Sequence, residues 1–272
     1  MPTDPLARAR VRAAAMAIAC DVHPLQNLQV LQKLRTLGHD VTVVEPVGTP
    51  MERVIGAVAS TAIQRHLEDA GIRFVLGTGI TGYLGGERVE GVVLGSGRVL
   101  PADVVVEAVG SLCNTEWLAE NGLDLADGVL TDNRMRVVGA ERVVAVGDVA
   151  RFPNPVFDDV PRRVEHWSIP TDTARVAAAT LVADLVGRPV TDEFRPVPSF
   201  WSDQLDLRLQ SLGSPALADE VVVAEGDPER LLDGLLVTYH REGRPVGTLA
   251  VNLGPARQRE LREQFSHPVP AA

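Results

Sequence analysis

The feature that most constrains the fold is a run of β-branched residues at 41–44, which follows a turn at Gly38 and ends at Glu45. Such a run is typical of a strand that is buried on both faces in a parallel sheet. Leucines recur at helical spacing over residues 28–37, and residues 15–20 form a short apolar run that could be an earlier strand. Together these segments predict a β-α-β unit.

The rest of the first half of the sequence, up to about residue 109, predicts one helix and several short strands. A second amphipathic helix is expected over residues 55–70, because Gly71 stands where helices commonly end. The apolar, β-branched segments predict strands at residues 72–76, 89–94, 99–100 and 103–109. A hairpin turn is expected at Gly85-Gly86.

The second half begins near Arg142, where residues 143–146 predict a strand that runs into Gly147-Asp148. Residues 171–186 predict a strong helix, with Pro170 in its first turn. The apolar stripe expected on this helix consists of Ala174, Ala178, Leu181 and Leu185. After a linker at residues 189–198, short β-like runs fill residues 200–253, and a charged helix covers residues 255–265.

The composition argues against several classes of protein. A formal net charge of −10 argues against nucleic acid as the main partner, because phosphate binding needs a basic surface. No apolar run reaches about 18 residues, so no membrane span is expected, and residues 1–19 lack the apolar core of a secretory signal. Cys20 and Cys113 are too few and too far apart for a disulfide framework or a metal cluster, which predicts a reducing, cytoplasmic setting.

Glu45 is the first candidate binding residue. In a dinucleotide-binding fold, an acid at the end of the second strand accepts hydrogen bonds from a ribose hydroxyl. The alternative is a solvated acid that only ends a strand. The Gly-rich loop of such a fold should fall at residues 22–27, which hold no glycine and include Pro24, so an NAD(P)H site is expected to be weak.

Gly147-Asp148 is a second candidate. A glycine there permits close approach of a cofactor, and the aspartate can accept a hydrogen bond from a ribityl or ribose hydroxyl. The alternative is a Gly-Asp turn whose aspartate caps the next helix.

Glu165-His166-Trp167 stands just before the helix predicted at residues 171–186. The partial positive charge of a helix N-terminus would stabilise the negative charge of a reduced flavin, and Trp167 could flank the ring. The alternative makes Trp167 a core residue and His166 its polar partner.

Trp201 lies in Phe200-Trp201-Ser202-Asp203-Gln204, an aromatic segment in a chain with only 4% aromatic residues. An aromatic side chain here could cover a flavin face. The alternative is a hydrophobic contact between domains.

The order of the motifs resembles that of a known family. The motifs stand at residues 41–46, 114–118, 127–129, 146–150, 163–167 and 200–204. This order resembles the bacterial ferredoxin, rubredoxin and putidaredoxin reductases of the pyridine nucleotide–disulfide oxidoreductase superfamily. The Glu-His-Trp and Phe-Trp-Ser-Asp-Gln motifs are specific to that branch, and the resemblance runs from about residue 15 to residue 262.

The resemblance implies an α/β fold and a redox function. We expect an NAD-type Rossmann-like domain at residues 1–141, a partial FAD domain at 142–193 and a small α+β C-terminal domain at 194–272. The implied function is a flavoprotein oxidoreductase that moves electrons from NAD(P)H through FAD to an iron–sulfur protein. Its implied partner is a ferredoxin-like protein.

The resemblance also implies roles for individual residues. Asp148 matches the residue that binds the ribityl chain of FAD, with Gly147 beside it. Trp167 and the helix start beside it match the isoalloxazine side, and Trp201 matches an aromatic near the flavin.

The sequence departs from the family where the cofactors bind. Glu45 and Gly110 match positions of the NADH site, but the NAD glycines are replaced. The family's first FAD-binding segment is missing, and Cys113 stands where the family usually has Pro. Ile169-Pro170 and Thr173-Ala174 also differ from the family pattern.

These departures leave two hypotheses open. In the first, the chain is a reductase that holds FAD weakly or has lost it, and that self-associates or needs a partner chain to supply the missing half. In the second, it is a truncated, degenerate relative without redox activity, either a binding protein or an enzyme of another class in the former flavin cleft.

Overall fold

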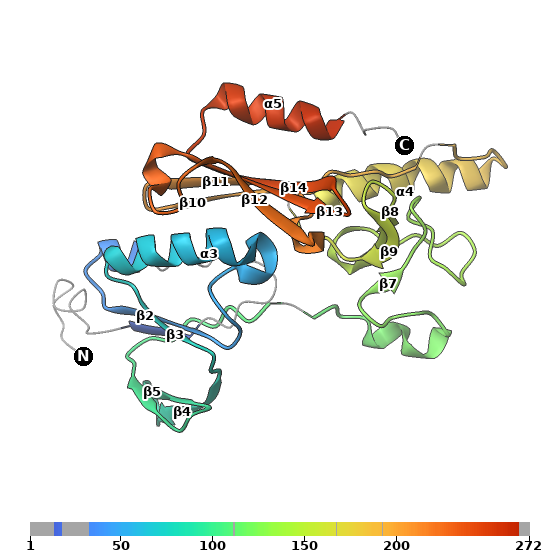
Figure 1. Ribbon diagram of the computed structural model, residues 1–272. Coiled ribbons are helices and arrows are strands. Elements are labelled where there is room, and N and C mark those ends of the chain that lie inside the picture. The colour runs from blue at the N-terminus through green and yellow to red at the C-terminus, as the bar shows by residue number, and fades with distance from the viewer. Residues whose placement is uncertain (1–13, 18–32, 111, 167, 192, 267–272) are drawn as a thin grey trace. The chain divides into compact units, whose positions relative to one another are not determined.

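The computed structural model describes residues 14–17, 33–110, 112–166, 168–191 and 193–266 (Figure 1). The chain divides into two compact units. The first comprises residues 1–111, 201–211 and 215–255, and the second comprises residues 112–200, 212–214 and 256–272. Helices and strands are mixed in both units, which confirms the α/β class, whereas the finer three-domain boundaries stay a prediction.

A parallel sheet with the order β1-β2-β3 begins the first unit. It consists of β1 (Ala14–Ala17), β2 (Val41–Glu45) and β3 (Arg73–Leu76), and β2 is buried along its whole length. The parallel pairing of β1 with β2 confirms the two strands of the predicted β-α-β unit, although residues 18–20 of the first predicted strand lie outside the described residues. Of the helix expected between them, residues 33–36 are helical, and residues 28–32 lie outside the described residues.

Helix α3 (Glu52–Asp69) follows β2 and buries the apolar face that its sequence predicts. Ile55, Ile63 and Leu67 are fully buried. The helix begins earlier than expected, but Gly56 adopts non-helical angles inside it. Gly71 ends it as predicted, with a φ of +86°.

A three-stranded antiparallel sheet completes this part of the first unit. It consists of β4 (Ile80–Gly85), β5 (Val89–Leu94) and β6 (Val99–Pro101), in that order. Val92, Leu94 and Leu100 form a buried cluster with Val44 of β2. The turn between β4 and β5 confirms the expected hairpin.

The strand predicted at residues 103–109 is wrong. Residues 103–110 form no ladder with any described strand. Val104 is 46% exposed and Val109 is 56% exposed. A valine-rich run becomes a strand only where a neighbouring strand supplies hydrogen-bond partners and a packing surface, which the sequence pattern alone does not guarantee.

A five-stranded sheet with the order β10-β11-β14-β13-β12 confirms the β-rich C-terminal part. Its strands are β10 (Ser199–Gln204), β11 (Leu207–Gly213), β12 (Glu220–Gly226), β13 (Leu235–Arg241) and β14 (Arg244–Val251). The buried Tyr239 donates a hydrogen bond of 2.5 Å to the carbonyl oxygen of Ile55, next to Gly56 in α3. Helix α5 (Pro255–Ser266) follows the sheet, as predicted.

Besides α5, the described part of the second unit contains a small sheet and the long helix α4. The sheet has the order β7-β8-β9, formed by β7 (Val129–Leu130), β8 (Ala150–Asn154) and β9 (Asp158–Arg162). Its core is made by Val129, Met135, Val137, Ala145, Ala150, Phe152, Ile169 and Ala177. The strand expected at residues 143–146 is reduced to one isolated bridge, between Val144 and Arg136, because no longer ladder forms with a described neighbour.

Helix α4 (Ile169–Leu185) carries Pro170 in its first turn, as predicted, but the expected apolar stripe is wrong. The buried positions are Ile169, Thr173, Ala177 and Thr180. Ala174 and Ala178 are exposed, and Leu185 is 72% exposed. The two buried threonines are accommodated because their hydroxyls donate to the carbonyl oxygens of Ile169, at 2.6 Å, and Arg134, at 2.8 Å.

No helix in the described ranges is long and apolar enough to cross a membrane.

Candidate functional site

The second unit holds a tight corner at Gly147 and Asp148, which begins a short 3-10 helix (Gly147–Val149). Gly147 is buried and has a φ of +71°, a backbone conformation that favours glycine. Its N–H donates a 2.9 Å hydrogen bond to Oγ1 of Thr173. This bond joins the corner to the first turns of α4.

The backbone carbonyl oxygen of Asp148 is hydrogen bonded within the protein, whereas its side-chain carboxylate is not. Its carbonyl oxygen accepts hydrogen bonds from Nη1 of Arg163, at 3.3 Å, and from Sγ of Cys113, at 3.6 Å. Its side chain is exposed and has no hydrogen bond or ion pair with any residue that the structure describes. Asp148 is not a helix cap, because the N-cap of α4 is Ser168. The carboxylate is therefore available to a ligand.

Arg163 connects the corner to two acidic side chains. Its Nε donates to Asp127 at 2.7 Å, and its Nη1 is hydrogen bonded to Glu165. The side chain of Arg163 is 12% exposed and that of Glu165 is 5% exposed. Burial, the largest single effect, favours the neutral guanidine, but Asp127 and Glu165 outweigh it and raise the pKa of Arg163.

Cys113, which is a free cysteine, lies next to the corner. Burial raises the pKa of its thiol, while the neighbouring guanidinium of Arg163 opposes that shift. The thiol is therefore a neutral donor to the carbonyl oxygen of Asp148 at neutral pH.

The segment before α4 is described only in part. The ring of His166 meets the ring of Phe200 edge to face, with 6.1 Å between centroids. Its carbonyl oxygen accepts a hydrogen bond from the N–H of Ile169 as the helix begins. Trp167, which the family resemblance assigns to the isoalloxazine side, lies outside the described residues.

Three predicted site residues belong to the first unit. Glu45 is 5% exposed at the carboxyl end of β2, and its Oε1 accepts a 3.1 Å hydrogen bond from the N–H of Val47. It is therefore not the solvated acid of the alternative interpretation. Gly110 has a φ of +83°, and Trp201 of β10 is 63% exposed.

The sequence did not single out Arg163, Thr173 or Gly128 as parts of the site. Arg163 and Gly128 stood inside recognised motifs, and Thr173 was noted only as a departure from the family. Gly128 has a φ of +82°, and a Cβ there would lie 2.5 Å from the carbonyl oxygen of Val149 and 2.8 Å from Cδ of Arg163. Only a residue without a side chain lets these segments approach so closely.

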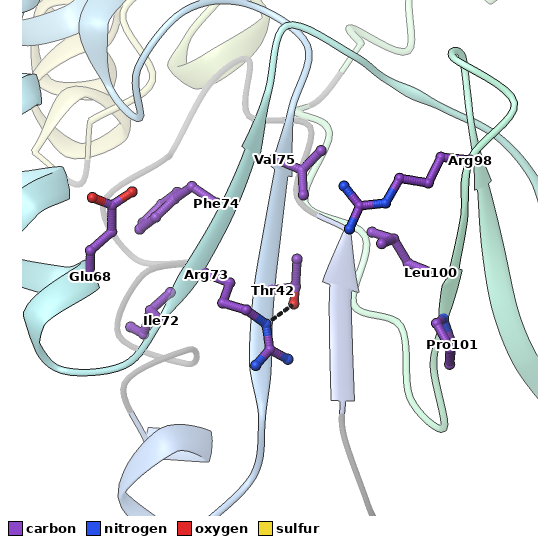
Figure 2. A pocket seen from close by; sticks show the side chains of 9 residues that line it. All are labelled: Thr42, Glu68, Ile72, Arg73, Phe74, Val75, Arg98, Leu100 and Pro101. Carbon is purple, nitrogen blue, oxygen red and sulfur yellow. Dashed lines mark hydrogen bonds between the residues drawn. The ribbon is translucent and has the colours of Figure 1, made fainter.

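A recess on the first unit lies near the amino ends of β2 and β3 (Figure 2). It has a volume of about 590 Å³ and is bordered by Arg98, by Leu100, and by Arg73, whose Nε donates to Oγ1 of Thr42 at 3.3 Å. Glu45 stands at the opposite, carboxyl end of β2. Because open α/β sheets bind ligands at the carboxyl ends of their strands, the recess is not where a dinucleotide is expected.

Two protein-family models match the chain. Residues 28–174 match the pyridine nucleotide-disulphide oxidoreductase model, and residues 199–268 match the reductase C-terminal model. These matches confirm the resemblance that the motifs indicated.

Named relatives agree with the family models. The chain is 34% identical over 237 residues to the probable ferredoxin reductase CtmF of Castellaniella defragrans, covering 83% of this chain and 53% of that protein. It is 31% identical over 243 residues to a rubredoxin-NAD(+) reductase of Ectopseudomonas oleovorans, covering 89% and 60%. The chain thus spans about half of the length of these relatives.

A solved structure supports the same fold. The crystal structure of a ferredoxin reductase from Rhodopseudomonas palustris matches with a TM-score of 0.82 and 30% identity, over 97% of this chain and 62% of that one. The predicted combination of a Rossmann-like part and a C-terminal reductase part is therefore confirmed.

Proposed function

The chain belongs to the pyridine nucleotide-disulphide oxidoreductase family, and on this premise we propose that it forms part of an FAD-dependent NAD(P)H reductase that delivers electrons to an iron–sulfur protein. The names of its relatives, ferredoxin reductase and rubredoxin-NAD(+) reductase, support this proposal. The observation that carries it is the corner, where a hydrogen-bonded backbone presents an Asp148 carboxylate that has no side-chain partner among the described residues.

The residues of the second unit fit the flavin side of FAD. The positive φ of Gly147 turns the backbone so that Asp148 is exposed, and the Asp148 carboxylate can accept hydrogen bonds from the hydroxyls of a ribityl chain. The adjacent start of α4 adds the partial positive charge of a helix N-terminus. When bound, FAD supplies the redox chemistry that side chains lack: it accepts a hydride and releases the two electrons singly.

The NAD(P)H side of the proposal rests on Glu45, which ends β2 where a dinucleotide-binding sheet places its ribose-binding acid. We propose that NAD(P)H binding is weak, because residues 22–27 contain no glycine. Those residues lie outside the described part of the chain. Gly110 is assigned to the same site on the strength of the resemblance.

The proposed partners are a ferredoxin-like protein, and either a second copy of this chain or another chain that covers the exposed apolar side of α4. Val182 and Leu185 of that helix, and Val186 directly after it, are each at least 60% exposed. Apolar surface of this kind marks interaction sites. A monodisperse monomer at tens of micromolar, measured by light scattering, would count against association. A cytoplasmic setting is also proposed, on cysteine content alone.

Titration of the purified chain with FAD, followed by flavin fluorescence, tests the proposed function. Because a hydrogen bond to a charged group contributes about 1.5–3 kcal/mol, Asp148→Asn should weaken FAD binding roughly ten- to a hundredfold. Asp159→Asn is the matched control, since Asp159 is an exposed acid on β9 of the same unit.

Two outcomes contradict the proposed function or its assignment. Weak FAD binding is consistent with the proposal, so absence of any FAD binding by the wild-type chain, even at the highest FAD concentration, would contradict the proposed flavin site and favour the non-redox relative. Equal FAD affinity of wild type and Asp148→Asn would remove Asp148 from the site.

A further inference from the structure

Arg163 is the point at which four separate chain segments meet in the second unit. Its guanidinium contacts the Asp127 side chain, the Asp148 carbonyl oxygen and the Glu165 side chain. Cys113, from a fourth segment, donates to the same carbonyl oxygen. One largely buried side chain therefore links residues that lie up to 36 positions away in sequence.

Gly128 lets Arg163 occupy this position. A Cβ at Gly128 would come within 2.8 Å of Cδ of Arg163 and within 2.5 Å of the carbonyl oxygen of Val149. The loop at residues 127–128 therefore passes directly against both the arginine stem and the backbone just after the corner. The close packing leaves Arg163 little freedom to move away from Asp148.

The acidic side chains around Arg163 explain why a charged guanidinium is stable in this partly buried position. Asp127 and Glu165 both pair with it, and Glu165 is nearly inaccessible to water. Without the guanidinium, the buried Glu165 would lose the cation with which it pairs. Removing one member of a buried ion pair is strongly unfavourable.

We propose that Arg163 is a positioning residue: it fixes the carbonyl oxygen of Asp148, and so holds the Asp148 carboxylate at the surface in the orientation that accepts the ribityl hydroxyls of a flavin. This inference rests on the proposed function. On the other side of the corner, Thr173 holds the N–H of Gly147. The corner is thus held from both sides. The bond to Thr173 fixes the backbone at Gly147, and the bond from Arg163 fixes the orientation of the Asp148 peptide.

A lysine cannot replace Arg163 in this role. The guanidinium uses Nε toward Asp127 and Nη1 toward Asp148 and Glu165, so its two ends serve acceptors in different directions. An ammonium is a single point of charge and lacks this planar fork. Arg163→Lys therefore keeps the charge but should release the Asp148 carbonyl oxygen.

The first measurement uses the flavin-free chain. Amide hydrogen exchange over residues 147–150 should be several-fold faster in Arg163→Lys than in wild type. Arg162→Lys is the matched control, because Arg162 is the adjacent residue and its Nη2 pairs with Asp158 at 2.8 Å, away from the corner. Unchanged exchange in Arg163→Lys would overturn the inference.

The second measurement is a double-mutant cycle in FAD affinity. Arg163→Lys should weaken FAD binding about five- to tenfold in the wild-type background and have no further effect in the Asp148→Asn background. An equal loss in both backgrounds would show that Arg163 only stabilises the fold, and would overturn the positioning role. Arg162→Lys should leave the affinity unchanged.

A third variant covers the case in which Arg163→Lys fails to fold. Asp127→Asn weakens one contact of the guanidinium but leaves Arg163 and its bonds to Asp148 and Glu165 in place. Asp127→Asn should change amide exchange and FAD affinity less than Arg163→Lys does. Its effect on FAD affinity should also disappear in the Asp148→Asn background. Absence of any FAD binding by wild type overturns the proposed function. If wild type binds FAD but the effects of the two substitutions on FAD affinity simply add, only the role of Arg163 is overturned.

Discussion

The sequence predicts an apolar stripe on each of the long helices α3 and α4, yet the two helices are buried in different ways. In α3, the apolar residues Ile55, Ile63 and Leu67 are all fully buried, as the pattern predicts. In α4, the apolar stripe is displaced by one position and Thr173 and Thr180 face inward. An amphipathic pattern therefore shows which residues can be buried, and the neighbouring elements determine which ones are.

The neighbours of the two helices explain the difference. The start of α3 receives a hydrogen bond from Tyr239 of the five-stranded sheet. The inward side of α4 meets a loop and the corner, whose backbone groups need hydrogen-bond partners, and threonine hydroxyls supply them. Val182 and Leu185 of α4 are left on the exposed side, whereas Ile169 and Ala177 are buried.

The largest expected effect contrasts one apolar residue from each helix. Ile63→Ala in α3 should lower the free energy of unfolding by about 2–5 kcal/mol, because Ile63 is fully buried. Leu185→Ala in α4 should change it by less than about 0.5 kcal/mol. Urea denaturation measures both, and a loss in Leu185→Ala as large as that in Ile63→Ala would mean that another surface covers this side of α4.

A smaller effect is expected at the inward face of α4. Thr173→Val preserves the shape of the side chain but leaves the buried N–H of Gly147 without its acceptor, which should cost about 1–3 kcal/mol. Thr171→Val is the matched control, because Thr171 is exposed on the same helix. If the stability of Thr173→Val equalled that of the control in the same denaturation assay, the hydroxyl would not be what holds the corner.

The smallest effect is the pH dependence of stability that comes from Tyr239, whose hydroxyl is hydrogen bonded to α3. Burial raises the pKa of Tyr239 above the ordinary value, so the folded state favours the neutral phenol. This contribution to stability is fully present below about pH 10 and is lost as the pH rises above it, because the phenol ionises first in the unfolded chain. Denaturation midpoints at about pH 9 and about pH 11 should therefore differ less in Tyr239→Phe than in wild type.

Tyr83 provides an internal comparison for that experiment. Its hydrogen bond to Glu107 raises the pKa of Tyr83 as well, although this side chain is 53% exposed. It remains present in both proteins, so the difference between wild type and Tyr239→Phe isolates Tyr239. An identical pH dependence in the two proteins would argue that Tyr239 is not buried as described.

Much of the fold could be predicted because its signals are local. The run at 41–44 became β2, Gly71 ended α3, and the glycines at 85–86 lie at the turn between β4 and β5. Periodicity and positive-φ turns depend only on nearby residues. The predictions failed at residues 103–109 and 143–146, where a strand requires a partner that lies elsewhere in the chain.

For the site, the sequence by itself determined the residue types and their order: Gly147 and Asp148 after an apolar run, an acid at the end of β2, and the motifs of a reductase family. Only the tertiary structure decided that Arg163 holds the Asp148 carbonyl oxygen, that Thr173 holds Gly147, and that Gly128 makes room for both segments. The physical reason is that these contacts join distant segments, and no local pattern specifies which buried donor will meet which acceptor once the chain has packed.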